Sequence, residues 1–204
     1  MTSIKNLPVF GRVFSTNTRT FTFGARVSPG ASPEIGAFVK TEPFESSLGH
    51  ITVVGVVCQV KCEGDSGVRA LSASDQVVTE TEVEWQRNRH VPIEVKVIPL
   101  GYYVQRPEDV VYGYIPLPPP ILKPVWLCDD DEVRALTKTP DFLRGILDTK
   151  ETPDVNSVIH AVIDRAARVH AKPSDFKRQC GRMIVRRLGD DPQRAEDILY
   201  RLSL

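Results

Sequence analysis

The sequence predicts an α+β protein in which a small antiparallel β-barrel is followed by an extended proline-rich strap and a C-terminal helical bundle. Three observations lead to this fold class. Short hydrophobic stretches with a two-residue period recur in the first half, and five prolines fall within residues 116–124. Beyond residue 131 the hydrophobic period changes to that of helices. We therefore expect a barrel domain over 1–112, a strap over 113–130 and a helical region over 131–204.

Four segments of the first half predict strands. Gly11–Val27 alternates around a Ser/Thr/Asn turn, and Glu34–Glu42 is a short strand between prolines. Gly49–Cys62 is a long β-branched run in which Gly55 predicts a bulge or bend, and Val83–Val104 places alternate apolar residues on one face. The segment 63–75 has turn residues without a period, which indicates a loop. Short strands with no helical pattern between them favour a barrel or a sandwich.

The strap is expected to be partly buried, because apolar residues are threaded through its prolines. A proline-rich ligand would instead have a disordered, polar setting. We interpret the segment as an extended strap that leaves the barrel. The residues expected to be buried are Ile115, Leu117, Ile121, Leu122, Val125 and Trp126.

The last third predicts a compact group of amphipathic helices. Asp131–Leu147 indicates one or two short helices broken at Pro140, and Thr152–His170 is a longer helix that Thr152 can cap. A third helix is expected over about Ser174–Leu188, with Gly189 as its stop. A fourth begins at Asp191 and Pro192.

Composition favours no class of ligand. The 204 residues carry 26 basic and 26 acidic side chains. No apolar run approaches the ~20 residues of a membrane helix, and the N-terminus lacks the apolar core of a signal peptide. We expect a cytoplasmic protein without membrane contact, whose cysteines are free buried thiols rather than a disulfide framework. These cysteines are Cys58, Cys62, Cys128 and Cys180.

No motif predicts catalysis or a cofactor. The sequence lacks a phosphate-binding loop, a GxSxG elbow, an HExxH pair and a dinucleotide fingerprint. The acidic run 129–132 could hold Mg²⁺ through its carboxylates. Its position before a helix favours a cap at Asp129 or Asp130, with the other acids in the first turn. We therefore expect no catalytic residue, no metal and no cofactor.

The third predicted helix carries the candidate contact surface. Its basic residues are Lys177, Arg178, Arg182, Arg186 and Arg187, and three of the arginines recur at four-residue spacing. Such a stripe could meet phosphates or an acidic partner surface. It could equally be a solvated face with local pairs to Asp175 or Asp190. No aromatic residue interleaves with the stripe, so the sequence does not indicate a platform for stacking single-stranded bases.

Three stretches, taken in order, have the motifs of one known module. The first is Gly11, Arg12 and Val13 at a strand start, and the second is Gly36, Phe38 and Val39. The third runs from Gly101 and Tyr102 through the strap positions Pro116, Pro118, Pro119, Pro120, Pro124, Val125, Asp129, Asp130, Asp131 and Glu132. Together they resemble the HAS barrel, the N-terminal β-barrel of HerA-type DNA translocases and ATP-synthase catalytic subunits. The sequence departs from the family pattern at Lys123, where a glycine is expected, and at His50 and Ile51.

The resemblance implies a role in assembly. In the HerA family the barrel forms the crown of a hexameric ring and contributes to docking a NurA-type nuclease. The RecA-like ATPase that follows the barrel there has no counterpart after Leu136, so ATPase and helicase activities do not carry over. Our first hypothesis is a non-enzymatic oligomerisation or docking module that assembles with a HerA-like ATPase, a NurA-like nuclease or itself. The alternative is an accessory nucleic-acid-binding protein that uses the basic helix. A third hypothesis is an enzyme with a concealed site around Asp129–Glu132.

Overall fold

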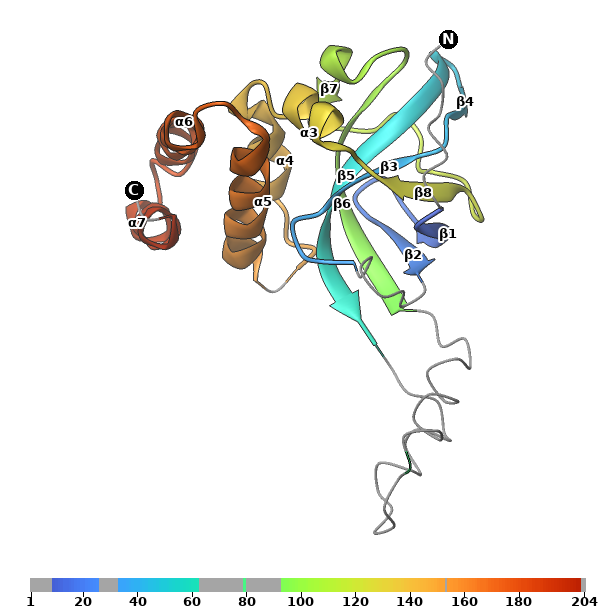
Figure 1. Cartoon of the computed structure of the whole chain (residues 1–204), viewed down its shortest axis with the longest axis horizontal. Helices are drawn as coiled ribbons and strands as arrows, with labels where there is room; N and C mark the ends of the chain where they lie inside the picture. The colour runs from blue at the N-terminus through green and yellow to red at the C-terminus, as the bar shows by residue number, and fades with distance from the viewer. Residues whose placement is uncertain (1–8, 26–32, 63–78, 80–92, 153, 203–204) are drawn as a thin grey trace.

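Six strands close into an antiparallel barrel in the computed structural model, which describes residues 9–25, 33–62, 79, 93–152 and 154–202 (Figure 1). The order around the barrel is β1-β2-β6-β5-β3-β8, and β8 pairs with β1 to complete the circle. These strands are β1 (Gly11–Thr16), β2 (Phe21–Ala25), β3 (Phe38–Thr41), β5 (Gly49–Lys61), β6 (Ile93–Tyr103) and β8 (Pro124–Leu127). Two short strands, β4 (Phe44–Ser46) and β7 (Val111–Tyr112), extend the sheet at β5 and β6. The predicted α+β class and small antiparallel barrel are confirmed.

The β1–β2 hairpin is closed by an asparagine turn. The Oδ1 atom of Asn17 accepts hydrogen bonds from the backbone N–H groups of Arg19 (2.7 Å) and Thr20 (2.9 Å). This arrangement lets a short side chain satisfy two donors that the tight turn leaves unpaired. The register then places Val13 opposite Phe23, and both side chains are fully buried in the barrel.

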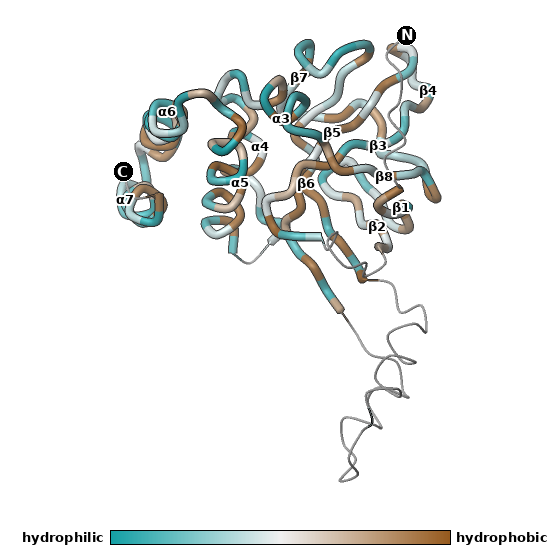
Figure 2. The backbone as a smooth tube through the Cα atoms, in the orientation of Figure 1, coloured by the Kyte–Doolittle hydropathy of each residue, from teal (hydrophilic) through white to brown (hydrophobic). Residues whose placement is uncertain are grey.

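Strands β5 and β6 form a wall between two hydrophobic cores. Ile51, Val53 and Val57 of β5 face the barrel interior, whereas Val54 and Val56 belong to a second core shared with the helices. A strand buried on both faces needs a nearly continuous apolar run, which explains the β-branched stretch in β5. Figure 2 shows the hydrophobic colour along both strands. The register of the pair shifts between Val54 and Gly55, which confirms the irregularity predicted there.

The final part of the predicted strap does not leave the barrel. Pro124–Leu127 is β8, which lies between β1 and β3. Pro124 lacks an N–H, but it stands first in the strand and its carbonyl accepts a hydrogen bond from the backbone of Glu42 at 3.0 Å. The sequence does not predict this strand. It has only four residues, it begins with a proline, and four other prolines precede it, so its strand signal is weak.

Burial of the proline-rich segment is mixed. Ile115 and Val125 are buried as predicted, and Trp126 is partly buried. The prediction was wrong for Leu117, Ile121 and Leu122, which are 43%, 54% and 65% exposed. The backbone N–H of Leu122 donates to the carbonyl of Val13 at 2.7 Å, and the φ of Leu122 is +65°. The left-handed residue is therefore Leu122, next to Lys123, in a conformation that glycine adopts more readily than leucine.

The helices follow the predicted boundaries closely. They are α3 (Asp130–Leu136), α4 (Leu143–Leu147), α5 (Val155–Val169), α6 (Pro173–Arg187) and α7 (Pro192–Arg201), with 3₁₀ turns η1 (Pro107–Asp109) and η2 (Pro140–Phe142). The cap of α5 is Asp154 rather than Thr152, since the Asp154 carboxylate accepts from the backbone N–H of Ser157 at 3.0 Å. Asp191 caps α7 in the same way through Arg194.

Helices α4 and α5 pack against the β5–β6 wall, and α6 and α7 lie beyond them (Figure 1). Gly36, which precedes β3, has a φ of +81°, and a Cβ there would lie 2.7 Å from the backbone carbon of Ala161 in α5. Glycine is therefore required both for the turn and for the close approach of barrel and helix. Lys40 of β3 adds an ion pair with Glu132 of α3.

Three expectations fall partly or wholly outside the described residues, and one of them is the segment Gly11–Val27, whose last two residues are not described. The predicted loop 63–75 lies outside the described residues, as does the first part of the predicted strand Val83–Val104, up to residue 92. Among the helices that are described, none is long and apolar enough to cross a membrane.

Candidate anion-binding surface

Helix α6 presents its arginines to solvent because its apolar residues are used in the core. Phe176, Cys180 and Ile184 are buried against the other helices. Arg178, Arg182 and Arg186, at the same spacing but on another side of the helix, are all exposed. The predicted stripe is therefore a surface feature.

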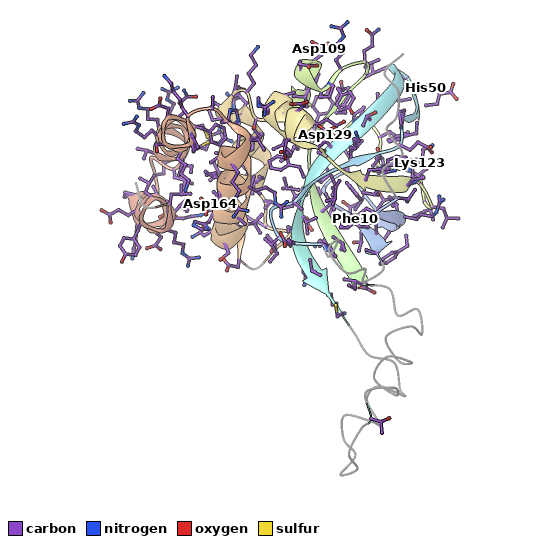
Figure 3. The ribbon with its side chains drawn as sticks, in the orientation of Figure 1. Phe10, His50, Asp109, Lys123, Asp129 and Asp164 are labelled. Carbon is purple, nitrogen blue, oxygen red and sulfur yellow. The ribbon has the colours of Figure 1, made fainter. Side chains whose placement is uncertain are left out.

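Three of the five predicted contact residues are already paired within the chain. The Nζ atom of Lys177 lies 2.5 Å from the carboxylate of Asp164, which Figure 3 labels on α5, and Arg178 pairs with Asp175 one turn earlier. The guanidinium of Arg187 lies 2.5 Å from Asp148, which follows α4. The bond to Asp148 raises the pKa of Arg187, and the bond from Arg178 lowers the pKa of Asp175. These three side chains match the alternative given in the sequence analysis, a solvated helix face with ion pairs inside the chain.

Arg182 and Arg186 differ from their neighbours. Neither side chain has a hydrogen-bond or ion-pair partner within the part of the chain that the structure describes. They are one helical turn apart on α6. Two adjacent arginines with free guanidinium groups are suited to a ligand with several negative charges.

A hollow of about 490 Å³ lies between these arginines and the η2–α4 segment. Arg144 of α4 joins Arg182, Arg186 and Arg187 at this hollow, which we call the arginine hollow, and its guanidinium lies 2.7 Å from Asp141. The remaining lining residues are Asp141 itself, Pro140, Gln179 and Met183. Sequence reasoning missed Arg144, because nothing in a single isolated arginine signals that its helix packs beside α6.

A second hollow of about 560 Å³ lies between the barrel and the helices, and we call it the junction hollow. It shares Arg144 and Arg187 with the arginine hollow. Its other lining residues are Thr18, Arg19, Ile98, Pro99, Gly113, Tyr114, Ile115, Gly145, Asp148, Thr149, Lys150 and Glu151. The two hollows are therefore neighbours with a common border.

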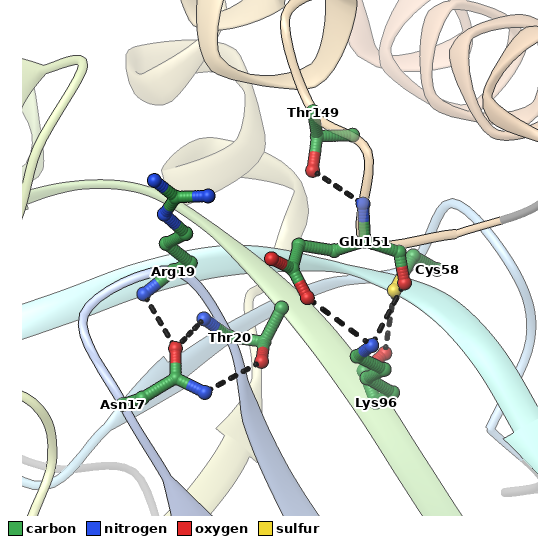
Figure 4. A network of polar contacts seen from close by, with 7 residues as sticks. All are labelled: Asn17, Arg19, Thr20, Cys58, Lys96, Thr149 and Glu151. Carbon is green, nitrogen blue, oxygen red and sulfur yellow. Dashed lines mark hydrogen bonds and ion pairs between the residues drawn. The ribbon is translucent and has the colours of Figure 1, made fainter.

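Glu151, at the edge of the junction hollow, is bound to the barrel. The Nζ atom of Lys96 donates to the Glu151 carbonyl at 2.7 Å and lies 3.6 Å from its carboxylate (Figure 4). The nearby thiol of Cys58 donates to the carbonyl of Lys96 at 3.4 Å. This network holds the segment after α4 against β6, which fixes the wall of the hollow.

The described cysteines are free thiols, as predicted, but they differ in burial. Cys58 and Cys180 are buried, Cys128 is partly buried and Cys62 is exposed, contrary to expectation. Burial raises the pKa of Cys58 to about 11 and that of Cys180 to about 12. Thiols held protonated in this way are poor nucleophiles.

The acidic run before α3 has the predicted capping role. The carboxylate of Asp129 accepts from the N–H of Glu132 at 2.9 Å, and the Glu132 carboxylate accepts from the N–H of Asp129 at 3.0 Å. This is a complete capping box. Asp131 pairs with Arg134, so the side chains at 129, 131 and 132 have structural partners. Within the described ranges, no group of three His, Cys, Asp or Glu residues is placed to hold a metal ion.

Comparison of the sequence with models of protein families and with curated proteins finds no match. The structure itself gives the class of protein: it is an α+β protein with a closed six-stranded antiparallel barrel and an arginine-lined face on its helical side.

Proposed function

We propose that this protein is a non-enzymatic docking module, in which the barrel and its attached helices hold an arginine face against an anionic surface of a macromolecular partner. The observation that carries the proposal is the pair Arg182 and Arg186, exposed and without partners in the described chain, beside Arg144 and Arg187 in one hollow. A concave surface in which one sign of charge predominates attracts and orients the opposite charge.

A protein partner is our first choice. The resemblance of the barrel to that of HerA-type translocases motivates a HerA-like ATPase or a NurA-like nuclease as the partner, or a further copy of this chain. Exposed apolar side chains support a protein interface: Leu122 follows Ile121 and lies beside β1, where Phe14 is 44% exposed. Apolar residues of this kind are common at the centre of protein interfaces.

A second candidate is an accessory nucleic-acid-binding protein. It is favoured by the charge of the lining residues: the two hollows together hold six basic residues and three acidic ones, whereas the whole chain is balanced. Phosphates are the anions for which arginine clusters are most often used.

The anion-binding arginine face is tested by retention on immobilised heparin, a general polyanion. Replacing Arg182 and Arg186 together by glutamate is expected to lower the salt concentration needed for elution, because binding of a polyanion releases counterions in proportion to the number of its charges that the protein neutralises. Replacing Arg168 and Arg201 together by glutamate is the matched control, since it reverses the same number of charges at exposed arginines of α5 and α7 that line neither hollow. Equal retention of the double variant and the wild type would contradict the proposal.

The protein partner is tested separately by titration calorimetry with a purified HerA-type ATPase and a purified NurA-type nuclease, and by light scattering of the chain alone. Binding or self-association that is weakened by Ile121→Glu would support the apolar contact. A monomer that binds neither protein would remove this choice and leave the nucleic-acid candidate.

A further inference from the structure

Tyr114 gives the junction hollow an aromatic wall that the sequence did not reveal. The residue follows β7, far from the arginines of α6 in the chain, yet it lines the hollow that adjoins them. The residue is 57% exposed. The expectation that no aromatic residue accompanies the arginine stripe holds along α6, but it does not hold on the folded surface.

The orientation of the Tyr114 ring is fixed by its contacts with Tyr102. Tyr102 of β6 is buried, and the two rings meet edge to face with centroids 5.7 Å apart. The two hydroxyl groups are 3.2 Å apart and share a hydrogen bond. An aromatic ring held in this way loses little conformational entropy when a second ring stacks on it.

Basic side chains line the same hollow as this ring, together with the acidic Asp148 and Glu151. Arg19 of the β1–β2 turn and Lys150 have no side-chain partner in the described residues, and Figure 4 shows the guanidinium of Arg19 extending away from its turn. Arg144 and Arg187 connect them to Arg182 and Arg186 in the arginine hollow. Cations therefore extend from α6, across α4, to the barrel.

We propose that the two hollows form one track for a single-stranded nucleic acid, with phosphates on the arginines and a base stacked on Tyr114. The inference rests on the nucleic-acid form of the proposed function and specifies its ligand. An exposed aromatic ring beside a basic groove is the combination that single-strand binding uses, because every base has a face that can stack. A duplex keeps its bases stacked on each other, so it would use the arginines but not the ring.

The test is fluorescence anisotropy with a labelled oligothymidylate of about 15 nucleotides, and with a duplex of the same length. We expect the single strand to bind more tightly. Tyr114→Ala is expected to weaken its binding by roughly 5- to 150-fold, the effect of losing one base–aromatic stack, and to leave duplex binding unchanged. Tyr114→Phe keeps the ring and is expected to retain most of the affinity. Tyr200→Ala is the control, because Tyr200 is 87% exposed on α7 and lines neither hollow.

The charge contribution is measured on the same single strand. Replacing Arg182 and Arg186 by glutamate should reduce the slope of log affinity against log salt by about 0.7 for each phosphate that the variant no longer neutralises. Circular dichroism of each variant verifies that the fold is intact.

Four results would overturn the inference, and they differ in which form of the proposed function they leave possible. Equal affinity for strand and duplex, or a Tyr114→Ala variant that folds and binds the strand normally, removes the stacking track but keeps a general polyanion surface. Absence of binding to both nucleic acids, with heparin retention intact, removes the nucleic-acid form and leaves protein docking. The same conclusion follows if a phosphorylated or acidic peptide displaces the protein from heparin while oligothymidylate does not bind.

Discussion

The guanidinium of Arg187 on α6 and the carboxylate of Asp148 after α4 meet at 2.5 Å, where the two hollows share their border. The pair joins residues 39 positions apart and places a negative charge within a largely basic surface. Its two side chains are half exposed, so solvent screens the bond and it contributes little to stability. Its effect on the charge of the surface is the larger consequence.

Asp148→Asn should therefore strengthen binding of polyanions. The substitution removes a negative charge and frees the Arg187 guanidinium, so elution from heparin is expected at higher salt, with an unfolding midpoint close to that of the wild type. Asp131→Asn is the matched control, because Asp131 pairs with Arg134 on α3, away from both hollows. The same increase in both variants would indicate a general charge effect rather than a site.

Gly36→Ala should destabilise the protein more than Gly49→Ala. Both glycines have positive φ, +81° and +93°, so an alanine at either position costs about 1–3 kcal/mol of backbone strain. At Gly36 the added Cβ would also meet the backbone of Ala161, whereas at Gly49 it meets no atom within 4 Å. Overpacking adds about 1–3 kcal/mol at the first site, which urea unfolding can measure. Equal losses would show that the approach of α5 to the barrel is not tight.

Asp129→Ala should lower stability by about 1 kcal/mol through loss of the capping box, or about 2–4 °C in the unfolding temperature. Asp130→Ala removes an acid that has no role in the box and should have a smaller effect. Added Mg²⁺ is expected to leave both variants and the wild type unchanged. Stabilisation of the wild type alone by Mg²⁺ would instead support the third hypothesis, a metal-dependent site in the acidic run.

His170 should make the fold sensitive to mild acid. Its Nε2 atom lies 2.8 Å from Oγ1 of Thr137, and its ring stacks on Phe176 at 4.1 Å. Burial, and then the charge of Arg134, lower the pKa of His170 below its ordinary value of 6.5. The unfolded chain then binds a proton more readily than the folded one, so this contribution to stability is complete above pH 6.5 and declines as the pH falls below it.

The measurement is urea unfolding at about pH 7.5 and about pH 5.5, which bracket the ordinary titration of histidine. His170→Gln should show a smaller loss of stability between the two pH values than the wild type does. His160→Gln is the control, because His160 is near Asp164 on α5 and does not contact Thr137 or Phe176. A loss of equal size in His170→Gln would assign the acid sensitivity to other groups.

Local sequence signals predicted most of the helices and the segments that form five of the six barrel strands. The caps at Asp129 and Asp191 and the stop near Gly189 depend on a few neighbouring residues, and these were found where expected. β8 was missed because a four-residue strand that starts at Pro124 derives its stability from partners in β1 and β3, which no local pattern records. The exposure of Ile121 and Leu122 was missed for the same reason.

In the candidate surface, too, local patterns predicted some residues, and the others depend on contacts between distant parts of the chain. The α6 arginines could be found from their helical spacing, whereas Arg144, Tyr114 and Arg19 could not. They come from a short helix, a segment after β7 and a hairpin turn, and the fold alone brings them to the shared hollows. The sequence also could not predict which arginines lack a partner, because the partner of Arg187 is Asp148, which lies 39 residues earlier in the chain.

The pairing of β1 with β8 has a consequence for how the chain reaches its native state. Gly11 lies opposite Val125, so the barrel cannot close until almost two thirds of the chain has left the ribosome. Until then β1 and β3 each present an unpaired edge. Contacts of such long sequence separation slow folding, and exposed edges favour aggregation of the nascent chain. Expression of fragments that end before residue 127 should for this reason give aggregates, whereas fragments that retain β8 keep every strand of the barrel.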